Sequence, residues 1–339
     1  MSIFIQGMGW VTPLGAGLDD VWAQLENGGR PEPKEFSVPY SPRKHAYFGI
    51  PPKITDALGR NPRVRRSSVI TYYSVTAALA ALENAGITMT PEIAERTAVV
   101  FAICSGGVVY TRKFYEMIVQ QGANAASPLL FPETVYNAPA SHLAALLGTT
   151  GMSYTLVGDG SIGLTALKFA EQLLETADID RCVVAGGEEL DWILCEAYRS
   201  WRLPAMLAEG GAAIVLGRQG RIKIGEIHEG ISFSKRAGAR AAIRKVHGDL
   251  AAKAGRADLV VSCANGTFID AAEASAIAES SPGTPVDHPK QAFGEALGAG
   301  ALLQTIHGAL ALEKRNLGKV LVSSLGFNQQ AGGLVLGPG

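Results

Sequence analysis

A short stretch near the middle of the chain has the form of a turn that could carry a nucleophile. Residues 154–170, YTLVGDGSIGLTALKFA, predict a strand, a sharp bend and then a helix whose apolar residues have helical spacing from Leu164 onward. Such a bend places a side chain at a helix N-terminus, where an anionic nucleophile is stabilised. The bend itself, residues 158–161 (GDGS), holds no cysteine and no obviously activated serine.

The polar side chains in and near this bend each have two interpretations. Asp159 could act as an acid or base, or it could hold the turn through local hydrogen bonds. Ser161 could take part in chemistry, although a serine at this point is typical of a helix-capping hydroxyl. Cys104, in the sequence ICSGG, ends a predicted strand and could offer a thiol near a cleft or serve only in packing.

Strand and helix patterns alternate along the chain, which predicts an α/β layered protein. Several strands are continuous apolar runs, as in a sheet that is covered on both faces. We predict strands at residues 3–6, 97–103, 153–157, 181–185, 212–216, 259–262, 320–323 and 333–336. We predict helices at residues 18–26, 67–85, 112–121, 139–147, 162–176, 237–254, 271–279 and 293–313.

The two parts of the chain contain similar glycine-bounded strands. GGAAIVLG (210–217) resembles AGGLVLG (331–337), and TAVVFAICSGG resembles ADLVVSCANGT. A duplicated α/β unit stacked on its copy would explain the similarity, as would chance. We expect an N-terminal half at residues 1–217 and a C-terminal half at residues 218–339.

The amino-acid composition argues against some classes of binding partner. The chain has 339 residues, 47% of them hydrophobic, and a formal net charge of −1, so no global field favours nucleic acid or an anionic membrane. The one basic stretch, residues 60–66 (RNPRVRR), is either a solvated loop or a docking site for an acidic partner. The four cysteines lack metal-ligand spacing and fit a reducing compartment. We therefore expect a cytoplasmic protein with no metal, no cofactor and no membrane span.

Several motifs, in order along the chain, resemble those of the β-ketoacyl synthases, the condensing enzymes of the thiolase superfamily. In the N-terminal half they are IQGMGWVTPLGAGLDDVWAQLENG, SPLLFPETVYNAPASHLAALLG and GLTALKFAEQLLETADIDRCVVAGGEE. In the C-terminal half they are CANGTFIDAAEASAI, HPKQAFGEALGAGALLQTI and SSLGFNQQAGGLVL. The resemblance implies a thiolase-like five-layer αβαβα fold made of two similar halves. It also implies a dimer and an acyl thioester carried by an acyl carrier protein.

The resemblance also locates the family's catalytic groups, a cysteine and two histidines, and none is present. The cysteine position corresponds to Gly160, the first histidine to Asn265 and the second to Glu295. Glycine cannot form an acyl-enzyme, and asparagine cannot shuttle a proton near neutral pH. An anionic glutamate would oppose a developing enolate. We therefore do not expect this chain alone to catalyse decarboxylative condensation.

Other family positions are kept. Lys290 matches the family's lysine, and Asp270 and Glu273 match its acidic positions after the first histidine. Phe327 falls at the gating phenylalanine, but the two glycines that follow it in the family are replaced by Asn-Gln at 328–329. The family also has a longer stretch where this chain has residues 188–210, so we expect a shorter or more open cap over the cleft.

Our leading hypothesis is a non-condensing subunit of a type II fatty acid or polyketide synthase, an aryl-polyene system included. Like a chain-length factor, it would pair with a cysteine-containing ketosynthase, although a homodimer is also possible. The resemblance implies an interface segment at about residues 125–150. There Leu130, Phe131 and Thr134 would reach toward the partner and limit the acyl chain, or serve only as interface core.

Two other hypotheses remain open. Asp159, Ser161, Asn265, Lys290 and Glu295 could converge in one cleft with altered acyl-thioester chemistry, as a hydrolase or acyltransferase. A carboxylate beside a lysine could then act as a general base, with the Cys104 thiol nearby. Alternatively, the chain could be a binding protein that sequesters acyl carriers.

Overall fold

The computed structural model describes residues 2–327 and 330–339, so Asn328 and Gln329 lie outside the described residues. The strands are β1 (Ile3–Val11), β2 (Lys34–Ser37), β3 (Lys44–Tyr47), β4 (Thr97–Ile103), β5 (Ser153–Val157), β6 (Arg181–Glu188), β7 (Gly210–Gly217), β8 (Ile222–Ile227), β9 (Ile231–Ser232), β10 (Leu259–Val261), β11 (Val286–Asp287), β12 (Val320–Leu325) and β13 (Gln330–Pro338).

The α-helices are α1 (Leu18–Glu26), α2 (Asp56–Gly59), α3 (Val69–Asn84), α4 (Pro91–Glu95), α5 (Val108–Gln121), α6 (Ala138–Leu147), α7 (Ile162–Thr176), α8 (Trp192–Ser200), α9 (Arg236–Ala254), α10 (Phe268–Ser280), α11 (Lys290–Phe293) and α12 (Leu297–Lys314). Short 3-10 turns are η1 (Pro52–Ile54), η2 (Ala123–Ala125) and η3 (Phe131–Thr134).

The main sheet repeats one topology twice. Its path is β11-β10-β12-β13-β8-β1-β7-β6-β4-β5, with β9 beside β13. In the first half, β5, β4 and β6 are parallel, and β7 and β1 follow antiparallel. In the second half, β11, β10 and β12 are parallel, and β13 and β8 follow antiparallel. The expected two similar halves are confirmed, whereas the boundary between residues 217 and 218 stays a prediction.

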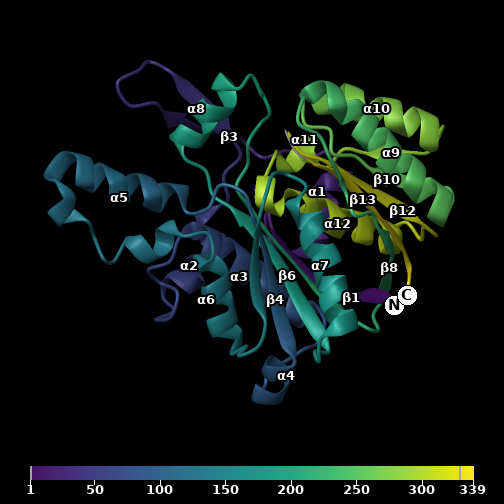
Figure 1. Cartoon of the computed structure of the whole chain (residues 1–339), viewed down its shortest axis with the longest axis horizontal. Helices are drawn as coiled ribbons and strands as arrows, with labels where there is room; N and C mark the ends of the chain where they lie inside the picture. Colours follow the sequence, from purple (N-terminus) through teal and green to yellow (C-terminus); the bar gives the residue numbers. More distant parts are fainter. Residues whose placement is uncertain (1, 328–329) are drawn as a thin grey trace.

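Helices and sheet alternate in five layers (Figure 1). Helices α3 and α6 cover the outer face of the first half, and α9 and α10 cover that of the second. Helices α7 and α12 lie between the halves, where α12 packs against β6 and β7 on one side and β12 and β13 on the other. Every residue from Leu297 to Leu312 in α12 is buried, as expected for a helix that is apolar all round.

Two glycines in β1 bring this strand against α3. A Cβ on Gly7 would lie 2.2 Å from the carbonyl oxygen of Ala81, and one on Gly9 would lie 2.3 Å from that of Ala77. The alanine-rich face of α3 and the missing side chains of β1 therefore allow contact at backbone distance.

The predicted helix at 293–313 is wrong at its N-terminal end. Gly294 has a φ of +74° and separates α11 from α12. The backbone of Glu295 leaves the helical path and pairs with another segment instead. Its N–H donates to the Met206 carbonyl at 2.8 Å, and its carbonyl accepts from Ala208 N–H at 3.0 Å. This break in the helix places the Glu295 side chain at the candidate functional site, which is described below.

The sequence patterns at 222–227 and 192–200 also form elements that were not predicted, β8 and α8. The N- and C-termini lie close together at the edge where β1 meets β8 (Figure 1). In the part of the chain that the structure describes, no helix combines the length and apolarity that a membrane crossing needs.

Candidate functional site

The bend between β5 and α7 has the predicted form. Strand β5 ends at Val157, Gly158 N–H donates to the Ile103 carbonyl at 3.1 Å, and α7 begins at Ile162. A Cβ built on Gly160 would have Glu295 Oε1 as its nearest described neighbour, at 3.4 Å, which is an ordinary contact. Position 160 therefore has room for a Cβ atom, which would lie against Glu295.

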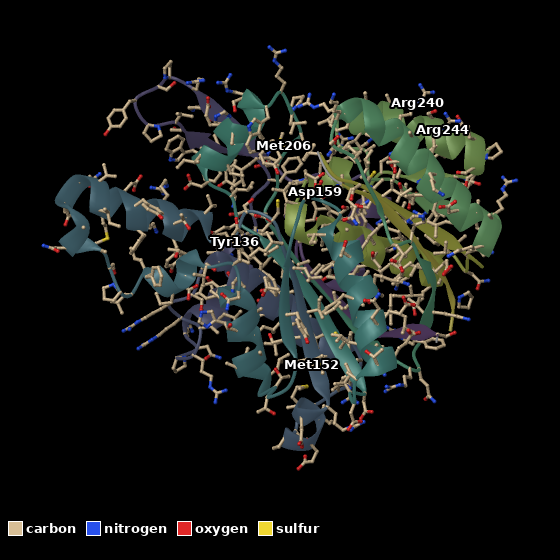
Figure 2. The ribbon with its side chains drawn as sticks, in the orientation of Figure 1. Tyr136, Met152, Asp159, Met206, Arg240 and Arg244 are labelled. Atoms are coloured by element: carbon tan, nitrogen blue, oxygen red, sulfur yellow. The ribbon has the colours of Figure 1, made fainter. Side chains whose placement is uncertain are left out.

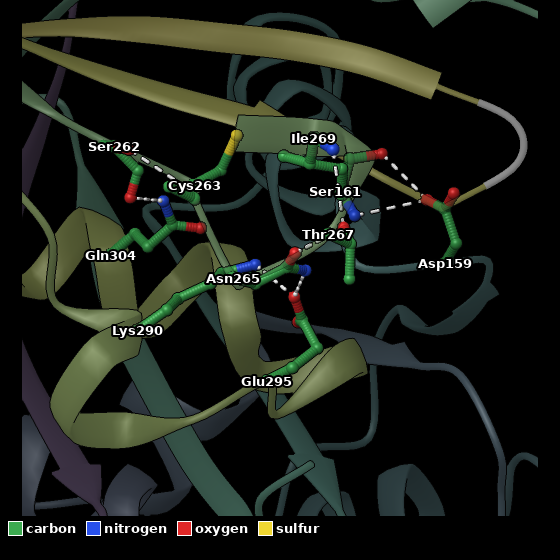
Figure 3. A network of polar contacts seen from close by, with 12 residues as sticks. Asp159, Ser161, Ser262, Cys263, Asn265, Thr267, Ile269, Lys290, Glu295 and Gln304 are labelled. Carbon is green, nitrogen blue, oxygen red and sulfur yellow. Dashed lines mark hydrogen bonds and ion pairs between the residues drawn. The ribbon is translucent and has the colours of Figure 1, made fainter. Parts of the chain in front are cut away.

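The three positions that we predict to correspond to the family's catalytic groups meet at this point. The Glu295 Oε2 atom accepts from Lys290 Nζ at 2.7 Å and from Asn265 Nδ2 at 2.8 Å (Figure 3). Thr267 Oγ1 donates to Asn265 Oδ1 at 2.6 Å, which orients the amide so that its nitrogen faces the carboxylate. The Lys290 and Glu295 side chains are each only 2% exposed.

This arrangement pairs a buried carboxylate with a buried ammonium group through one carboxylate oxygen. Burial acts to lower the pKa of Lys290, but the Glu295 carboxylate more than offsets this effect, so the pKa lies above its ordinary value. Within residues 2–327 and 330–339, the second carboxylate oxygen, Glu295 Oε1, is buried and accepts no hydrogen bond. The site therefore holds a buried ion pair in contact with the bend at Gly160.

Asp270 and Glu273 support the neighbouring backbone. Asp270 Oδ1 accepts from the N–H groups of Asn265 at 2.8 Å and Gly266 at 3.1 Å, at the start of α10. Glu273 is buried and accepts from Cys263 N–H at 2.9 Å and from the Ser262 hydroxyl. Both carboxylates thus fix the loop that presents Asn265 to Glu295.

Asp159 and Ser161 form a separate local pair. Ser161 donates to Asp159 Oδ1 from its N–H at 3.3 Å and from its hydroxyl at 3.0 Å. Ser161 occupies the N-cap of α7, but its hydroxyl caps no helix N–H among the described residues, so the capping prediction was wrong. Figure 3 shows this pair apart from Glu295. Of the five residues that could have converged in one cleft, Asn265, Lys290 and Glu295 are thus in mutual contact, but Lys290 and Glu295 are buried side chains and not part of an open cleft.

A cavity of about 480 Å³ lies on the Asp159 side of the bend. Its lining is mainly apolar: Cys104, Ser105, Val108, Val157, Gly158, Asp159, Ile193, Leu194, Ala197, Tyr198, Trp201, Leu203 and Phe327. The described lining includes the predicted Phe327, Cys104 and Asp159, and it does not include Lys290 or Glu295. The lining residues of α8 were missed in the sequence, although Ile193, Leu194, Ala197 and Tyr198 have helical spacing.

The Cys104 thiol is poorly suited to be a nucleophile. Burial raises its pKa well above the ordinary value, and the nearby carboxylates of Glu188 and Asp159 raise it further. The thiol also interacts with the Tyr198 hydroxyl. Cys104 therefore lines the cavity as a neutral thiol.

The predicted interface residues lie elsewhere, on an arm formed by α5, η2 and η3 that projects from the body (Figure 1). Phe131 is 56% exposed and its ring lies 5.8 Å from that of Phe114. Leu130 and Thr134 are half-buried beside it. These residues do not line the cavity, so any role in an acyl tunnel depends on a partner.

Exposed apolar side chains are found on the arm and also on and near β5. Val119 and Val157 are 82% and 52% exposed, and Val157 lies both on the edge strand β5 and at the cavity. Further exposed members are Tyr115, Leu129, Tyr136, Met152 and Tyr154. Figure 2 shows Tyr136 beside the arm and Met152 near the start of β5. Large apolar side chains exposed in this number make the arm and the β5 edge a candidate interaction surface.

Comparison with known proteins gives the class of this chain. The profile of the β-ketoacyl synthase N-terminal domain matches residues 1–210. The chain therefore belongs to the β-ketoacyl synthase family, and the resemblance seen in its motifs is confirmed.

Curated relatives match over part of the chain. The 3-oxoacyl-[acyl-carrier-protein] synthase 2 of Vibrio harveyi is 23% identical over 189 residues, 55% of this chain and 45% of the relative. The mitochondrial 3-oxoacyl-[acyl-carrier-protein] synthase of Arabidopsis thaliana is 25% identical over 208 residues, 55% of this chain and 44% of the relative. The match thus spans less than half the length of these relatives.

Solved structures match over nearly the whole chain. The ishigamide ketosynthase/chain length factor has a TM-score of 0.86 and 19% identity, covering 100% of this chain and 99% of that one. The ketosynthase ApeO in complex with its chain length factor ApeC, from Xenorhabdus doucetiae, has a TM-score of 0.77 and 19% identity, covering 100% and 98%. At these identities the similarity shows the fold, which confirms the predicted thiolase-like architecture.

Proposed function

We propose that this chain is a non-condensing ketosynthase-like subunit of a type II fatty acid or polyketide synthase. One observation carries the proposal. Gly160, Asn265 and Glu295 meet at one point, and a buried ion pair with Lys290 occupies the place where the family's thiol and imidazoles would work. An ion pair of this kind offers no thiolate to attack a thioester and no imidazole to assist decarboxylation.

The partner in this proposal is a cysteine-containing ketosynthase. Strand β5 is an edge strand with exposed side chains, and such an edge can pair with a strand of another chain. The arm with Phe131 and Val119 would extend this interface, and the cavity at Val157 would open toward the partner. An acyl carrier protein would deliver the chain, and the assembly would be cytoplasmic. The similarity to structures described as ketosynthase/chain length factor pairs supports this arrangement.

Co-expression with a cysteine-containing ketosynthase encoded by a neighbouring gene tests the pairing. We expect the two chains to co-purify, and the Val119→Asp variant to weaken the complex because it buries a charge in the interface. Tyr40→Asp is the matched control, since Tyr40 is a fully exposed aromatic residue on the β2–β3 hairpin, away from the arm.

A second assay tests the missing chemistry. We expect the lone chain to form no β-ketoacyl product from malonyl- and acyl-carrier substrates, and the co-purified pair to form it. Detection of extended product from the lone chain would refute the proposal, as would failure of the two chains to associate at all.

Altered acyl-thioester chemistry is a second candidate because Asp159 lines the apolar cavity beside Cys104. The ion pair of Glu295 with Lys290 argues against it, since neither group lines that cavity. Acyl-thioester hydrolysis that is present in the wild-type chain and lost in Asp159→Asn would support this candidate over the first.

A further inference from the structure

The apolar cavity has a neighbour with which it shares a wall. A second cavity of about 190 Å³ is lined by His45, Ala46, Cys195, Tyr198, Arg199, Arg202, Leu203, Pro204, Ala205 and Leu207. Tyr198 and Leu203 belong to the linings of both cavities. Both are buried, so they form a wall that the 480 Å³ cavity and the 190 Å³ cavity share. We call this shared wall the partition and the two cavities the larger and the smaller chamber.

The C-terminal turn of α8 builds this partition. Leu203 N–H donates to the Tyr198 carbonyl, and Arg202 N–H donates to the Arg199 carbonyl, each at 3.0 Å. These two hydrogen bonds, around a residue in the left-handed conformation, form the Schellman motif. In this motif the residue after the left-handed one packs against the last helical turn. The motif therefore sets Leu203 beside Tyr198.

The left-handed position of this motif is occupied by an arginine. Arg202 has a φ of +58°, a conformation that costs an L-residue free energy and that glycine adopts freely. Strain of this kind persists where the surrounding structure imposes it, and it is found at sites that hold or close on a ligand. Here it coincides with the wall, and the Arg202 side chain itself lines the smaller chamber.

The two chambers differ in chemistry. The larger one is lined by aliphatic and aromatic side chains and suits an alkyl chain. The smaller one adds the charged or titratable groups His45, Arg199 and Arg202, of which His45 and Arg199 contact Glu196. An alkyl end that entered the smaller chamber would desolvate these groups, which is unfavourable.

We propose that Tyr198 and Leu203 form the stop that limits how far an acyl chain extends into this subunit. The inference rests on the proposed function, because it takes the ligand to be the alkyl part of an acyl thioester. It places the length limit on α8 of this chain, whereas the interface residues Leu130, Phe131 and Thr134 lie outside the cavity.

Binding of acyl N-acetylcysteamine thioesters of increasing length to the purified full chain tests the stop. Each further methylene buried raises affinity about fourfold, until the chain end reaches the partition. Beyond that length we expect the affinity of the wild-type protein to stay level or fall. In Leu203→Ala the affinity should keep rising beyond the wild-type break, by less than fourfold per methylene, because the partition then opens into the smaller chamber with its charged and titratable groups.

Leu207→Ala is the matched control, since Leu207 is buried and lines only the smaller chamber. This variant makes the same leucine-to-alanine truncation without opening the partition. The chain length at which its affinity stops rising should therefore match that of the wild type. If Leu203→Ala does not fold, judged by circular dichroism, Leu203→Val should move the break in the same direction by less.

A break at the same length in folded Leu203 variants would overturn the inference, and so would an equal shift in Leu207→Ala. Absence of any length dependence in the wild-type chain would also overturn it. These outcomes are independent of co-purification with a ketosynthase, so failure of the stop and failure of the proposed function can be told apart.

Discussion

At the scale of single residues, the main feature of the site is how the buried negative charge of Glu295 is neutralised. Its carboxylate is buried and would be unfavourable without a cation, and Lys290 supplies that cation at 2.7 Å. Asn265 donates a further hydrogen bond to the same oxygen. Asn265, Lys290 and Glu295 thus form one polar unit in which the buried carboxylate depends on both partners.

Removing one member of this unit should therefore be costly. We expect Lys290→Met to lower the free energy of unfolding by about 3–5 kcal/mol, because it leaves a buried carboxylate without its cation. The double variant Lys290→Met/Glu295→Leu should recover most of this loss, since it removes both charges. Urea unfolding of both variants and the wild type measures the difference.

The exposed pair Lys44–Glu35 is the control for this experiment. Its side chains are 58% and 53% exposed, so neutralising it should change the free energy of unfolding by less than about 1 kcal/mol. A loss below 1 kcal/mol in Lys290→Met as well would show that the buried pair contributes no more than a surface one.

At the scale of elements, α8 and the break before α12 decide the shape of the site. The break depends on Gly294, whose φ of +74° ends α11 and lets Glu295 pair with the 206–208 segment. Helix α8 also ends at a residue with positive φ, but this residue is an arginine and not the usual glycine. The two helix ends thus place, respectively, the ion pair and the wall of the cavity.

The arginine at the end of α8 leads to a stability prediction. Arg202→Gly should raise the free energy of unfolding by about 1 kcal/mol, because glycine adopts the left-handed conformation without steric cost. Arg202→Ala removes the same side chain and keeps the strain, so we expect little gain from it. If the alanine variant were stabilised as much as the glycine variant, the effect would come from the side chain and not from the backbone.

At the scale of the whole molecule, the two halves repeat one topology, but they carry different polar groups in their cores. The first half buries Glu188 and Glu189 at the end of β6. Glu188 accepts from Ser105 N–H and Gly298 N–H, each at 3.1 Å, and Glu189 accepts from Val109 N–H at 3.0 Å. These carboxylates thus join the first half to α12 and to the arm.

Their ionisation predicts how stability depends on pH. Burial raises the pKa of Glu188 to about 7 and that of Glu189 to about 8, from 4.5 for an ordinary glutamate, and the carboxylates of Glu209 and Asp191 add to the rise at Glu189. The folded state therefore holds protons that the unfolded state has lost. Their contribution to stability is full below about pH 4.5 and is lost as the pH rises to about 8.

The free energy of unfolding should thus fall by up to about 1.4 kcal/mol per pH unit for each group within this window. We expect Glu189→Gln to flatten the slope, as measured by urea unfolding from pH 5 to 8. Glu229→Gln is the control because Glu229 is exposed. An unchanged slope in Glu189→Gln would contradict the assignment.

Much of the fold was predictable from the sequence because its signals are local. A largely apolar run predicted β4, strand-forming residues predicted β5, both at their observed bounds, and the helical period predicted α1 and α7. The strand β8 alternates buried and exposed residues, so it lacks the continuous apolar run that predicted other strands. The short helix α8 and the break at Gly294 were missed because tertiary contacts stabilise them.

The sequence alone determined the family and the two similar halves, and it predicted the loss of the catalytic cysteine and histidines, because these follow from residue identity and order. Only the tertiary structure decided which polar residues act together. Asn265, Lys290 and Glu295 come from separate turns of the C-terminal half and meet because the chain breaks at Gly294, whereas Asp159 faces an apolar cavity on the other side of Gly160. The reason is physical: an ion pair and a cavity wall depend on the distances between elements, and those distances are set by packing and not by sequence spacing.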